Sequence, residues 1–323
     1  MRYIIYGAGA IGGVIGGRLF HRGHDVVLIC RGKHLTTIQS QGLTLKTPAE
    51  NLRLAIPAVG HPKELTFTDG DVVFLSMKSQ DTEAALRDLA LVAGSEVPIV
   101  CAQNGVDNER MAARRFARIY GMVVWMPSTY LEPGVVLNYS TPVDGVLDAG
   151  CYPQGIDPLI TQVTADLTAA GFSARPDSHI MRWKYAKLLD NLRNAIQAIC
   201  GLDARGGEIS RAAQQEAVAC YQAAGIDFVP RDEFHQRVQT EIKLTEIAGE
   251  PRGGGSSWQS LVRGLPSIEA DFLNGEIVLL GTLHGVPTPY NRVLQKVANE
   301  TVQTGKQPGS ISVEDLQRMV AIV

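Results

Sequence analysis

A glycine pattern near the N-terminus constrains the fold more than any other feature. Residues Gly7-Ala8-Gly9-Ala10-Ile11-Gly12 form a Gly-x-Gly-x-x-Gly run between an apolar segment, Tyr3–Tyr6, and a segment of helical character. In such a strand–turn–helix unit the first glycine permits a tight turn, the second admits a pyrophosphate, and the third lets the helix pack closely. The helix N-terminus adds N–H groups for the phosphates. We therefore predict a dinucleotide site here, with a ligand-free glycine turn as the alternative.

The end of the next predicted strand indicates which dinucleotide is bound. Binders of NAD usually carry an acidic residue there, which holds the ribose 2′-hydroxyl. In this chain the strand is followed by Arg31-Gly32-Lys33-His34, which contains no carboxylate. A guanidinium suits a 2′-phosphate, so Arg31 predicts NADPH, with Lys33 as a second candidate. The alternative is that both are ordinary surface cations.

The first half of the chain alternates short runs rich in Val and Ile with helical patterns, which is typical of a parallel sheet. Later runs at Gly134–Asn138 and Asp144–Asp148 are expected to add antiparallel edge strands, and a helix from Pro158 to Ala170 is expected to end at Gly171. This order predicts an α/β fold with a Rossmann doubly wound sheet. The predicted strands are Tyr3–Tyr6, Val26–Cys30, Val72–Ser76, Pro98–Cys101 and Gly121–Pro127.

Beyond Arg175-Pro176 the pattern becomes helical and strand-like runs nearly disappear. We predict two domains, an NADP(H)-binding Rossmann domain at 1–175 and an all-helical substrate domain at 176–323. One long helix is expected over residues 178–200. Ser256 and Gln259 have the spacing of a capping box, and Pro266 suits the first turn of a helix that continues through Leu279.

Composition excludes several classes of protein. The net charge of −3 gives no bulk attraction to nucleic acid, and no apolar run is long enough to cross a bilayer. The cysteines are odd in number and contain no CxxC pair, which predicts free thiols in the cytoplasm and no metal site. They are Cys30, Cys101, Cys151, Cys200 and Cys220.

Polar side chains that could carry chemistry fall on the predicted helix 178–200. On a helical wheel one face is apolar, while Asp190, Arg193 and Gln197 lie opposite and are expected to face water. A stripe of ammonium and amide groups runs between these faces and would suit an acceptor-rich ligand, although a solvated border is the alternative. The stripe consists of Lys184, Lys187, Asn191 and Asn194.

Other candidates lie at strand ends and in the last third of the chain. Lys78 and the turn Gln103-Asn104-Gly105 follow predicted strands, at the sheet edge where ligands bind. Ser256-Ser257 begins a predicted helix and could hold a carboxylate. Glu269 lies among apolar residues and is either a surface carboxylate or a buried acid with a raised pKa.

Taken together, these residues resemble those of the ketopantoate reductases (2-dehydropantoate 2-reductases). The glycine run, Lys78, Gln103-Asn104-Gly105, Lys187–Asn191, Ser256-Ser257 and Glu269 with Asn274-Gly275 match in order and approximate spacing over nearly the full chain. The resemblance implies an active site between a Rossmann domain and a helical domain. It also implies that Lys187 is the general acid and Glu269 assists, that Asn104, Asn191 and Ser257 bind substrate, and that Arg31, Lys78 and Asn104 contact the cofactor.

The resemblance implies an enzyme, an NADPH-dependent reductase of a 2-oxo acid, which would be ketopantoate reduced to pantoate for pantothenate biosynthesis. Ala195 and Leu261 depart from the family pattern, and a basic residue is missing before Glu269. Such departures alter specificity, so a same-fold reductase of another 2-oxo acid or an imine (opine-type) is one alternative. A non-catalytic NADPH sensor is another. A homodimer is the expected assembly.

Overall fold

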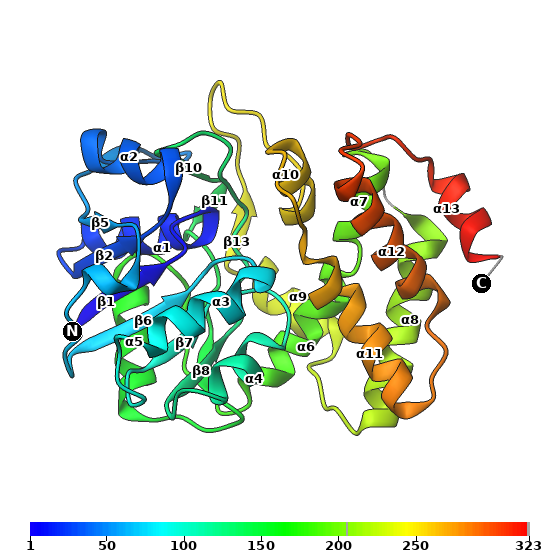
Figure 1. Cartoon of the computed structure of the whole chain (residues 1–323), viewed down its shortest axis with the longest axis horizontal. Coiled ribbons are helices and arrows are strands. Elements are labelled where there is room, and N and C mark those ends of the chain that lie inside the picture. Colours follow the sequence, from blue (N-terminus) through cyan, green and yellow to red (C-terminus); the bar gives the residue numbers. More distant parts are fainter. Residues whose placement is uncertain (205, 322–323) are drawn as a thin grey trace. The chain divides into compact units, whose positions relative to one another are not determined.

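The computed structural model describes residues 1–204 and 206–321, which form two compact units with separate hydrophobic cores. The sheet unit comprises Met1–Gln103, Asn108–Lys184 and Pro230–Arg252. The helical unit comprises Asn104–Asp107, Tyr185–Val229 and Gly253–Val323, described to residue 321. The chain therefore passes between the two units several times (Figure 1).

A seven-stranded sheet in the described residues forms the centre of the sheet unit, in the order β12-β8-β7-β6-β1-β2-β5. Neighbours are parallel except β12, which pairs antiparallel with β8. This confirms the doubly wound sheet predicted from the sequence. The strands are β1 (Arg2–Tyr6), β2 (Asp25–Ile29), β5 (Ala58–Val59), β6 (Asp71–Leu75), β7 (Ile99–Cys101), β8 (Ile119–Met122) and β12 (Ala149–Cys151).

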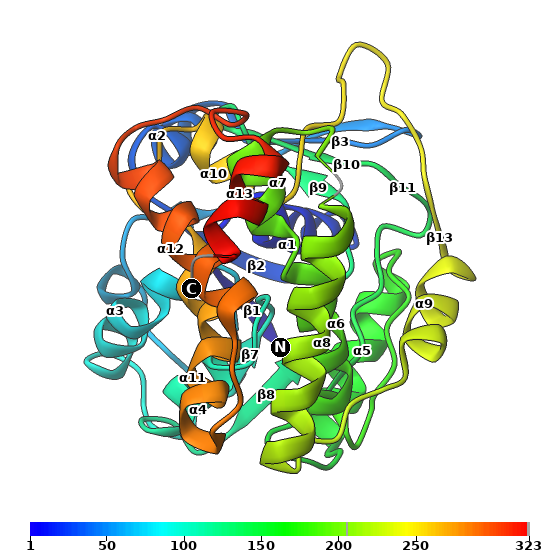
Figure 2. The same ribbon diagram turned by 90° about the vertical axis from the view of Figure 1, so that its right-hand side faces the viewer.

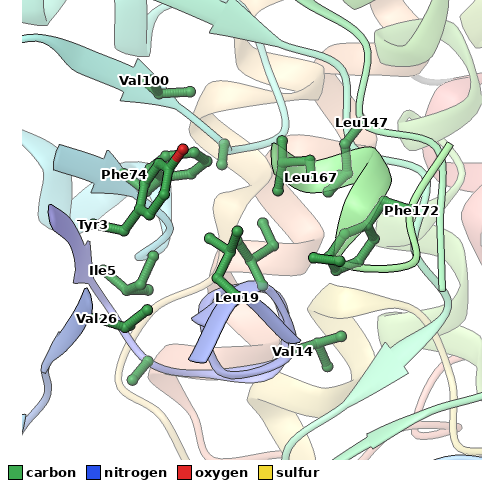
Figure 3. Close-up of a cluster of buried hydrophobic side chains, with 14 of the residues drawn as sticks. Tyr3, Ile5, Val14, Leu19, Val26, Phe74, Val100, Leu147, Leu167 and Phe172 are labelled. Atoms are coloured by element: carbon green, nitrogen blue, oxygen red, sulfur yellow. The ribbon is translucent and has the colours of Figure 1, made fainter. Parts of the chain in front are cut away.

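Side chains on one face of this sheet meet two helices, α1 (Ala10–His21) and α5 (Pro158–Ala169), which also pack against each other. The two-residue alternation of a strand sends Tyr3 and Ile5 to this face, and both are fully buried. Helices α3 (Ser79–Ala90) and α4 (Asn108–Ala113) pack together as a separate pair. Figure 3 shows this core around Tyr3, Ile5, Val14, Leu19, Val26, Phe74, Val100, Leu147, Leu167 and Phe172.

Three of the later strand predictions need correction. The run at 134–138 forms β10 (Val135–Asn138), but it is not an antiparallel edge of the main sheet. It pairs parallel with β3 (Leu43–Lys46) in a second sheet of order β4-β3-β10-β9, with β4 at Asn51–Leu54 and β9 at Ser128–Thr129. The small residues of α1 explain this placement, since Gly13 leaves room for Val136 of β10. The antiparallel edge strand is β12, just after the predicted Asp144–Asp148, in which Val146 forms only an isolated antiparallel bridge with Trp125. Strand β8 ends at Met122, before most of the predicted Gly121–Pro127.

The segment 230–252 also belongs to the sheet unit. It contains α9 (Arg231–Gln239) and β13 (Ile242–Leu244), which pairs antiparallel with β11 (Ser140–Pro142). The Arg237 guanidinium donates to both carboxylate oxygens of Asp148, at 2.7 and 2.9 Å. The remaining elements of this unit are α2 (Gly32–Gln41) and a 3-10 helix, η1 (Pro62–Glu64).

The helical unit confirms the helical character predicted for the C-terminal part. Helix α12 packs against α7, α8, α11 and α13, and α10 packs against α7 (Figure 2). Helix α6 (Ile180–Asn191) begins in the sheet unit and ends in the helical unit. The other elements are α7 (Asn194–Cys200), α8 (Gly207–Ala224), α10 (Ser256–Val262), the 3-10 helix η2 (Glu269–Phe272), α11 (Asn274–His284), α12 (Pro289–Gln303) and α13 (Val313–Val320).

The prediction of one helix over 178–200 was wrong, because the helix breaks at Leu192–Arg193, between α6 and α7. The Asn274 side-chain amide donates to the Leu192 carbonyl, at 3.2 Å. The Ile196 N–H then bonds to the Arg193 carbonyl instead of continuing the α-helical ladder. A distant side chain thus occupies the backbone acceptor that an unbroken helix would use.

The predicted capping box at Ser256 is also absent. Gly255 is the N-cap of α10 and makes no side-chain cap bond, while the Gln259 amide donates to the Gly254 carbonyl. The helix expected from Pro266 through Leu279 is instead η2 followed by α11.

Within the described ranges, which include all five cysteines, the thiols are free. The helices that the structure describes do not include one that could span a membrane.

Candidate functional site

The glycine turn after β1 shows why each glycine is needed. Gly7 has a φ of +101°, and a Cβ there would lie 2.5 Å from the Met77 nitrogen. A Cβ on Gly12 would collide with the Ser76 hydroxyl and the Gly7 carbonyl. At Gly9, by contrast, the nearest atom to a Cβ would be Tyr130 Cδ1, at 3.7 Å. The protein itself therefore leaves room at Gly9, which fits close approach of a dinucleotide pyrophosphate to the backbone.

The order of the sheet places this turn at a topological switch point. Strand β1 lies between β2 and β6, so these two later strands pair with β1 on its opposite sides. In open parallel sheets ligands bind in the crevice at such a point, outside the carboxyl ends of the strands. Arg31 and Lys78 follow β2 and β6 at this edge, as N-caps of α2 and α3. The structure thus brings the predicted cofactor residues Gly7–Gly12, Arg31 and Lys78 to one edge of the sheet.

Arg31 keeps a largely free guanidinium. Its side chain is 80 % exposed and lies 3.5 Å from the Asp81 carboxylate, which is itself half-exposed. An exposed ion pair of this kind contributes little, so a phosphate could compete for the guanidinium. No acidic residue stands in the four positions after Cys30. The edge of the sheet therefore fits a dinucleotide with an extra phosphate.

Lys184 is enclosed in the sheet unit. The side chains of Lys184 and Glu109 are 2 % and 0 % exposed, and their charged groups lie 2.8 Å apart. The ammonium also donates to the carbonyls of Gln103, at 2.8 Å, and Met122, at 3.2 Å. These partners engage all three N–H groups of the ammonium, so Lys184 holds strand ends together. Sequence reasoning missed Glu109, because its spacing from Lys184 follows no local pattern.

Lys187, one turn further along α6, has a different environment. It belongs to the helical unit and its side chain is partly covered. Desolvation lowers its pKa from 10.5 to about 8, and the charge of Arg193 also lowers this pKa while that of Asp190 opposes the shift. Asp190 is buried, contrary to the expectation that it faces water. Of the two lysines in the predicted stripe, Lys187 is the one suited to give up a proton near neutral pH.

Other predicted substrate residues lie in the same helical unit. Asn191 is buried, and within the described part of the chain its side-chain oxygen accepts no hydrogen bond. Ser257 is buried at the start of α10. Glu269 is 2 % exposed, so of the two alternatives it is a buried acid, and it accepts a long hydrogen bond from the Ser256 hydroxyl, at 3.5 Å.

Gln197 is a residue of this region that sequence reasoning missed. It was expected to face water, but its side-chain oxygen accepts a hydrogen bond from the Gly255 N–H, at 3.1 Å. Asn194 lies beside the same glycine, with its side-chain oxygen 3.2 Å from the position of a Cβ on Gly255. The break between α6 and α7 gives both side chains this direction, and no feature of the sequence marks that break.

The turn after β7 is divided between the units. The Gln103 amide donates to the Met77 carbonyl, at 3.0 Å, and to the Thr82 hydroxyl, at 2.7 Å, in the sheet unit. Asn104 and the next three residues belong to the helical unit, where Gly105 has a φ of +78° and approaches the Phe272 carbonyl. Asn104 thus joins Lys187, Asn191, Ser257 and Glu269 in one unit.

Comparison with known proteins now identifies the family. The family model of the ketopantoate reductases PanE/ApbA matches residues 3–153, and the model of their C-terminal part matches residues 179–303. The chain belongs to the ketopantoate reductase family. It is therefore an oxidoreductase, as the resemblance implied, with a nicotinamide dinucleotide cofactor, which agrees with the dinucleotide site that the glycine run predicted.

Members of this family match most of the chain. The 2-dehydropantoate 2-reductase of Archaeoglobus fulgidus is 30% identical over 297 residues, which cover 91% of this chain and 95% of that protein. The crystal structure of a PanE/ApbA family ketopantoate reductase from Ralstonia eutropha JMP134 is 28% identical with a TM-score of 0.78, covering 94% of this chain and 99% of that one. The structure of D-mandelate dehydrogenase with NADH and anilino(oxo)acetate shares the fold, with 21% identity, a TM-score of 0.79 and coverages of 94% and 99%.

Proposed function

We propose that this protein reduces a 2-oxo acid with NADPH, and that the substrate is 2-dehydropantoate, reduced to pantoate. The observation that carries the proposal is the lowered pKa of Lys187, in a unit that also holds Asn191, Ser257 and Glu269. A lysine with a pKa of about 8 can hold a proton at neutral pH and still release it to a strong base such as an alkoxide.

In the proposed reaction the bound cofactor supplies a hydride to the keto carbon. The Lys187 ammonium first donates a hydrogen bond to the keto oxygen and so stabilises the negative charge that develops there. It then transfers a proton from Nζ to that oxygen, which completes the hydroxyl group and leaves a neutral amine. Water returns the proton to Lys187 before the next turnover. Lys184 is unsuited to this step, because Glu109 and backbone carbonyls engage its ammonium.

The other side chains would hold the substrate. The buried Asn191 oxygen lacks a hydrogen-bond donor among the described residues and would accept one from a substrate hydroxyl. We assign the Ser257 hydroxyl to the substrate carboxylate and Asn104 to the substrate or the cofactor. Glu269, which is buried in the same unit, would assist as a hydrogen-bonding acid beside the substrate.

For the cofactor, we propose that the turn Gly7–Gly12 binds the pyrophosphate and that Arg31 binds the 2′-phosphate. An exposed guanidinium and the missing acid after β2 support NADPH over NADH. Lys78, at the end of β6, would contact the phosphates as a second cation.

The test is a steady-state assay of NADPH oxidation with 2-dehydropantoate. Replacing Lys187 by Ala should lower kcat about 100-fold or more while the Kd for NADPH changes little. Lys296→Ala is the matched control, because Lys296 is an exposed lysine of the same unit. Unchanged kcat in Lys187→Ala, or an equal loss in the control, would contradict the assignment.

A reductase of another 2-oxo acid or of an imine is the second candidate. This second candidate is favoured by the fold shared with D-mandelate dehydrogenase, which was solved with an aromatic oxo acid. The sequence departures give it less support than expected, because Ala195 and Leu261 are both buried in the hydrophobic core of the helical unit. A panel of 2-oxo acids, with and without amines, separates the candidates by kcat/KM. If a different compound is preferred over 2-dehydropantoate, the substrate assignment is wrong while the reductase assignment stands.

The homodimer also stays a prediction. Leu279 and Leu283 lie one turn apart on α11 and are 46% and 67% exposed, a pair that a second copy could cover. Light scattering at micromolar concentration tests it, and a monomeric mass would contradict it.

A further inference from the structure

We propose that His34 is a positioning residue for the cofactor. Its imidazole fixes the glycine turn after β1 relative to the loop that carries Arg31 and Lys33. The inference rests on the proposed cofactor site of the sheet unit and is independent of the substrate.

The ring of His34 has two hydrogen-bond partners that determine its tautomer. It lies in the first turn of α2, three residues after Arg31, and is 5% exposed. The Gly134 N–H donates to Nδ1 at 2.9 Å, and Nε2 lies 2.6 Å from the Ala8 carbonyl oxygen. Because a backbone N–H can only donate, Nδ1 must be an acceptor without a proton. The ring hydrogen is therefore on Nε2 and is donated to Ala8.

This hydrogen bond acts on the centre of the glycine turn. The peptide group between Ala8 and Gly9 has its carbonyl held by His34, and its N–H donates to the Gly7 carbonyl at 2.7 Å. Rotating this peptide would break both bonds. The next N–H groups belong to Ala10 and Ile11, in the first turn of α1, where no intrahelical acceptor exists. His34 thereby sets the direction of the groups that would meet the pyrophosphate.

The opposite side of the ring is held by the turn between β9 and β10. The Tyr130 ring packs on the imidazole with centroids 4.4 Å apart, and its Cδ1 reaches toward Gly9. Gly134 has a φ of +78°, and a Cβ there would collide with Thr37 of α2. Three segments that are distant in the sequence therefore converge on one imidazole: the glycine turn, α2 and the β9–β10 turn.

The loop that carries Arg31 and Lys33 needs such an anchor, because its exposed side chains do little to hold its backbone in place. Arg31 is mostly exposed and Lys33 is exposed. Gly32, between them, has a φ of +60°, a conformation that favours glycine. The buried His34 is the next residue, so it ties the backbone of this loop to the turn that would bind the pyrophosphate. We infer that His34 contributes to cofactor affinity without contacting the reacting atoms.

Two substitutions separate the bonds of the ring. In His34→Gln the amide nitrogen can donate to Ala8 from about the place of Nε2, whereas in His34→Asn the amide oxygen can accept from Gly134 at about the place of Nδ1. The Kd values for NADPH and NADH are measured by fluorescence titration, with kcat at saturating cofactor and Tm in parallel. We expect a Kd for NADPH about tenfold higher in His34→Asn and within about threefold of wild type in His34→Gln. kcat should stay within about twofold in both, because the chemical step is untouched.

His24→Asn is the matched control. His24 packs edge-on against Tyr3, next to the amino end of β2, and should leave both Kd values unchanged. A purely structural His34 would lower Tm in both variants and raise Kd equally or not at all, and this result would overturn the proposal. A folded His34→Asn that binds NADPH like wild type would also overturn it. If the wild-type protein binds neither NADPH nor NADH, the cofactor assignment itself fails and the His34 proposal falls with it.

Discussion

Removing the charge from each of the two lysines of α6 is expected to change stability in opposite directions. Lys184 forms a buried ion pair with Glu109 and also donates to the carbonyls of Gln103 and Met122. Lys184→Met would leave the Glu109 charge buried without this partner. Breaking a buried pair on one side costs about 3–5 kcal/mol, a large part of the stability of a typical domain.

Lys187→Met should stabilise the protein while abolishing turnover. Desolvation lowers the pKa of Lys187 from 10.5 to about 8, so keeping it charged in the folded state costs roughly 3 kcal/mol when fully applied. The side chain is only partly covered, and solvent screening reduces the expected gain to about 1–2 kcal/mol. Below pH 8 Lys187 is charged in both the folded and the unfolded chain, so the desolvation cost of this charge in the folded state is fully present. Between the two pKa values the unfolded state holds more protons, and wild-type stability therefore rises with pH.

The assay is urea unfolding of wild type, Lys184→Met and Lys187→Met at about pH 7 and about pH 10, with equal m values as the condition for comparison. At the lower pH Lys187→Met should be the most stable of the three proteins, wild type should be intermediate, and Lys184→Met should be the least stable. At the higher pH the advantage of Lys187→Met should shrink. The double variant Lys184→Met/Glu109→Gln should recover part of the loss, because it removes both charges. A Lys187→Met protein that is less stable than wild type, or a Lys184→Met protein within about 1 kcal/mol of it, would refute this reasoning.

Three further predictions follow from the site. The kcat for reduction should fall as pH rises through about 8, because reduction needs Lys187 protonated. The kcat for oxidation of the product should rise over the same range. If both kcat values change in the same direction, Lys187 is not the acid. Arg31→Asp should lower the ratio of kcat/KM for NADPH to that for NADH about tenfold or more, and an unchanged ratio would place the 2′-phosphate elsewhere. Gly9→Ala should keep the wild-type Tm but weaken NADPH binding. Gly12→Ala should lose about 1–3 kcal/mol of stability, because a Cβ at residue 12, unlike one at residue 9, meets protein atoms at close range.

The parts of the fold that follow local rules were predictable from the sequence. The strands that became β1, β2, β6 and β7 were marked by apolar runs of strand length, and the glycine run marked the turn from β1 into α1. Gly171, expected at the end of α5, indeed has a φ of +105° after Ala170. In each of these cases the deciding interaction lies within a few residues of the pattern.

Features that depend on distant partners could not be predicted in this way. The parallel pairing of β10 with β3 is decided by the surface of α1, and the ion pair of Lys184 by a glutamate on α4. The stripe on the predicted helix therefore joined two lysines that belong to different units. Spacing alone showed that both lie on one side of the helix. Lys184, which has a structural role, differs from Lys187, the proposed acid, in its burial and its interaction partners. The spacing of the residues in the sequence does not reveal either property.

The break in the helix also changes how the departures from the family pattern bear on the substrate. On an unbroken helix Ala195 would follow Asn191 on the same face, so the missing amide would leave a less polar site. With the break at Leu192–Arg193, Ala195 enters the hydrophobic core, and Asn194 lies beside Gly255 instead. An amide is thus present one position earlier, next to the loop that leads into Ser257. We therefore expect Asn194 to supply the amide that residue 195 lacks, which would be consistent with the proposed polar, hydroxylated oxo acid.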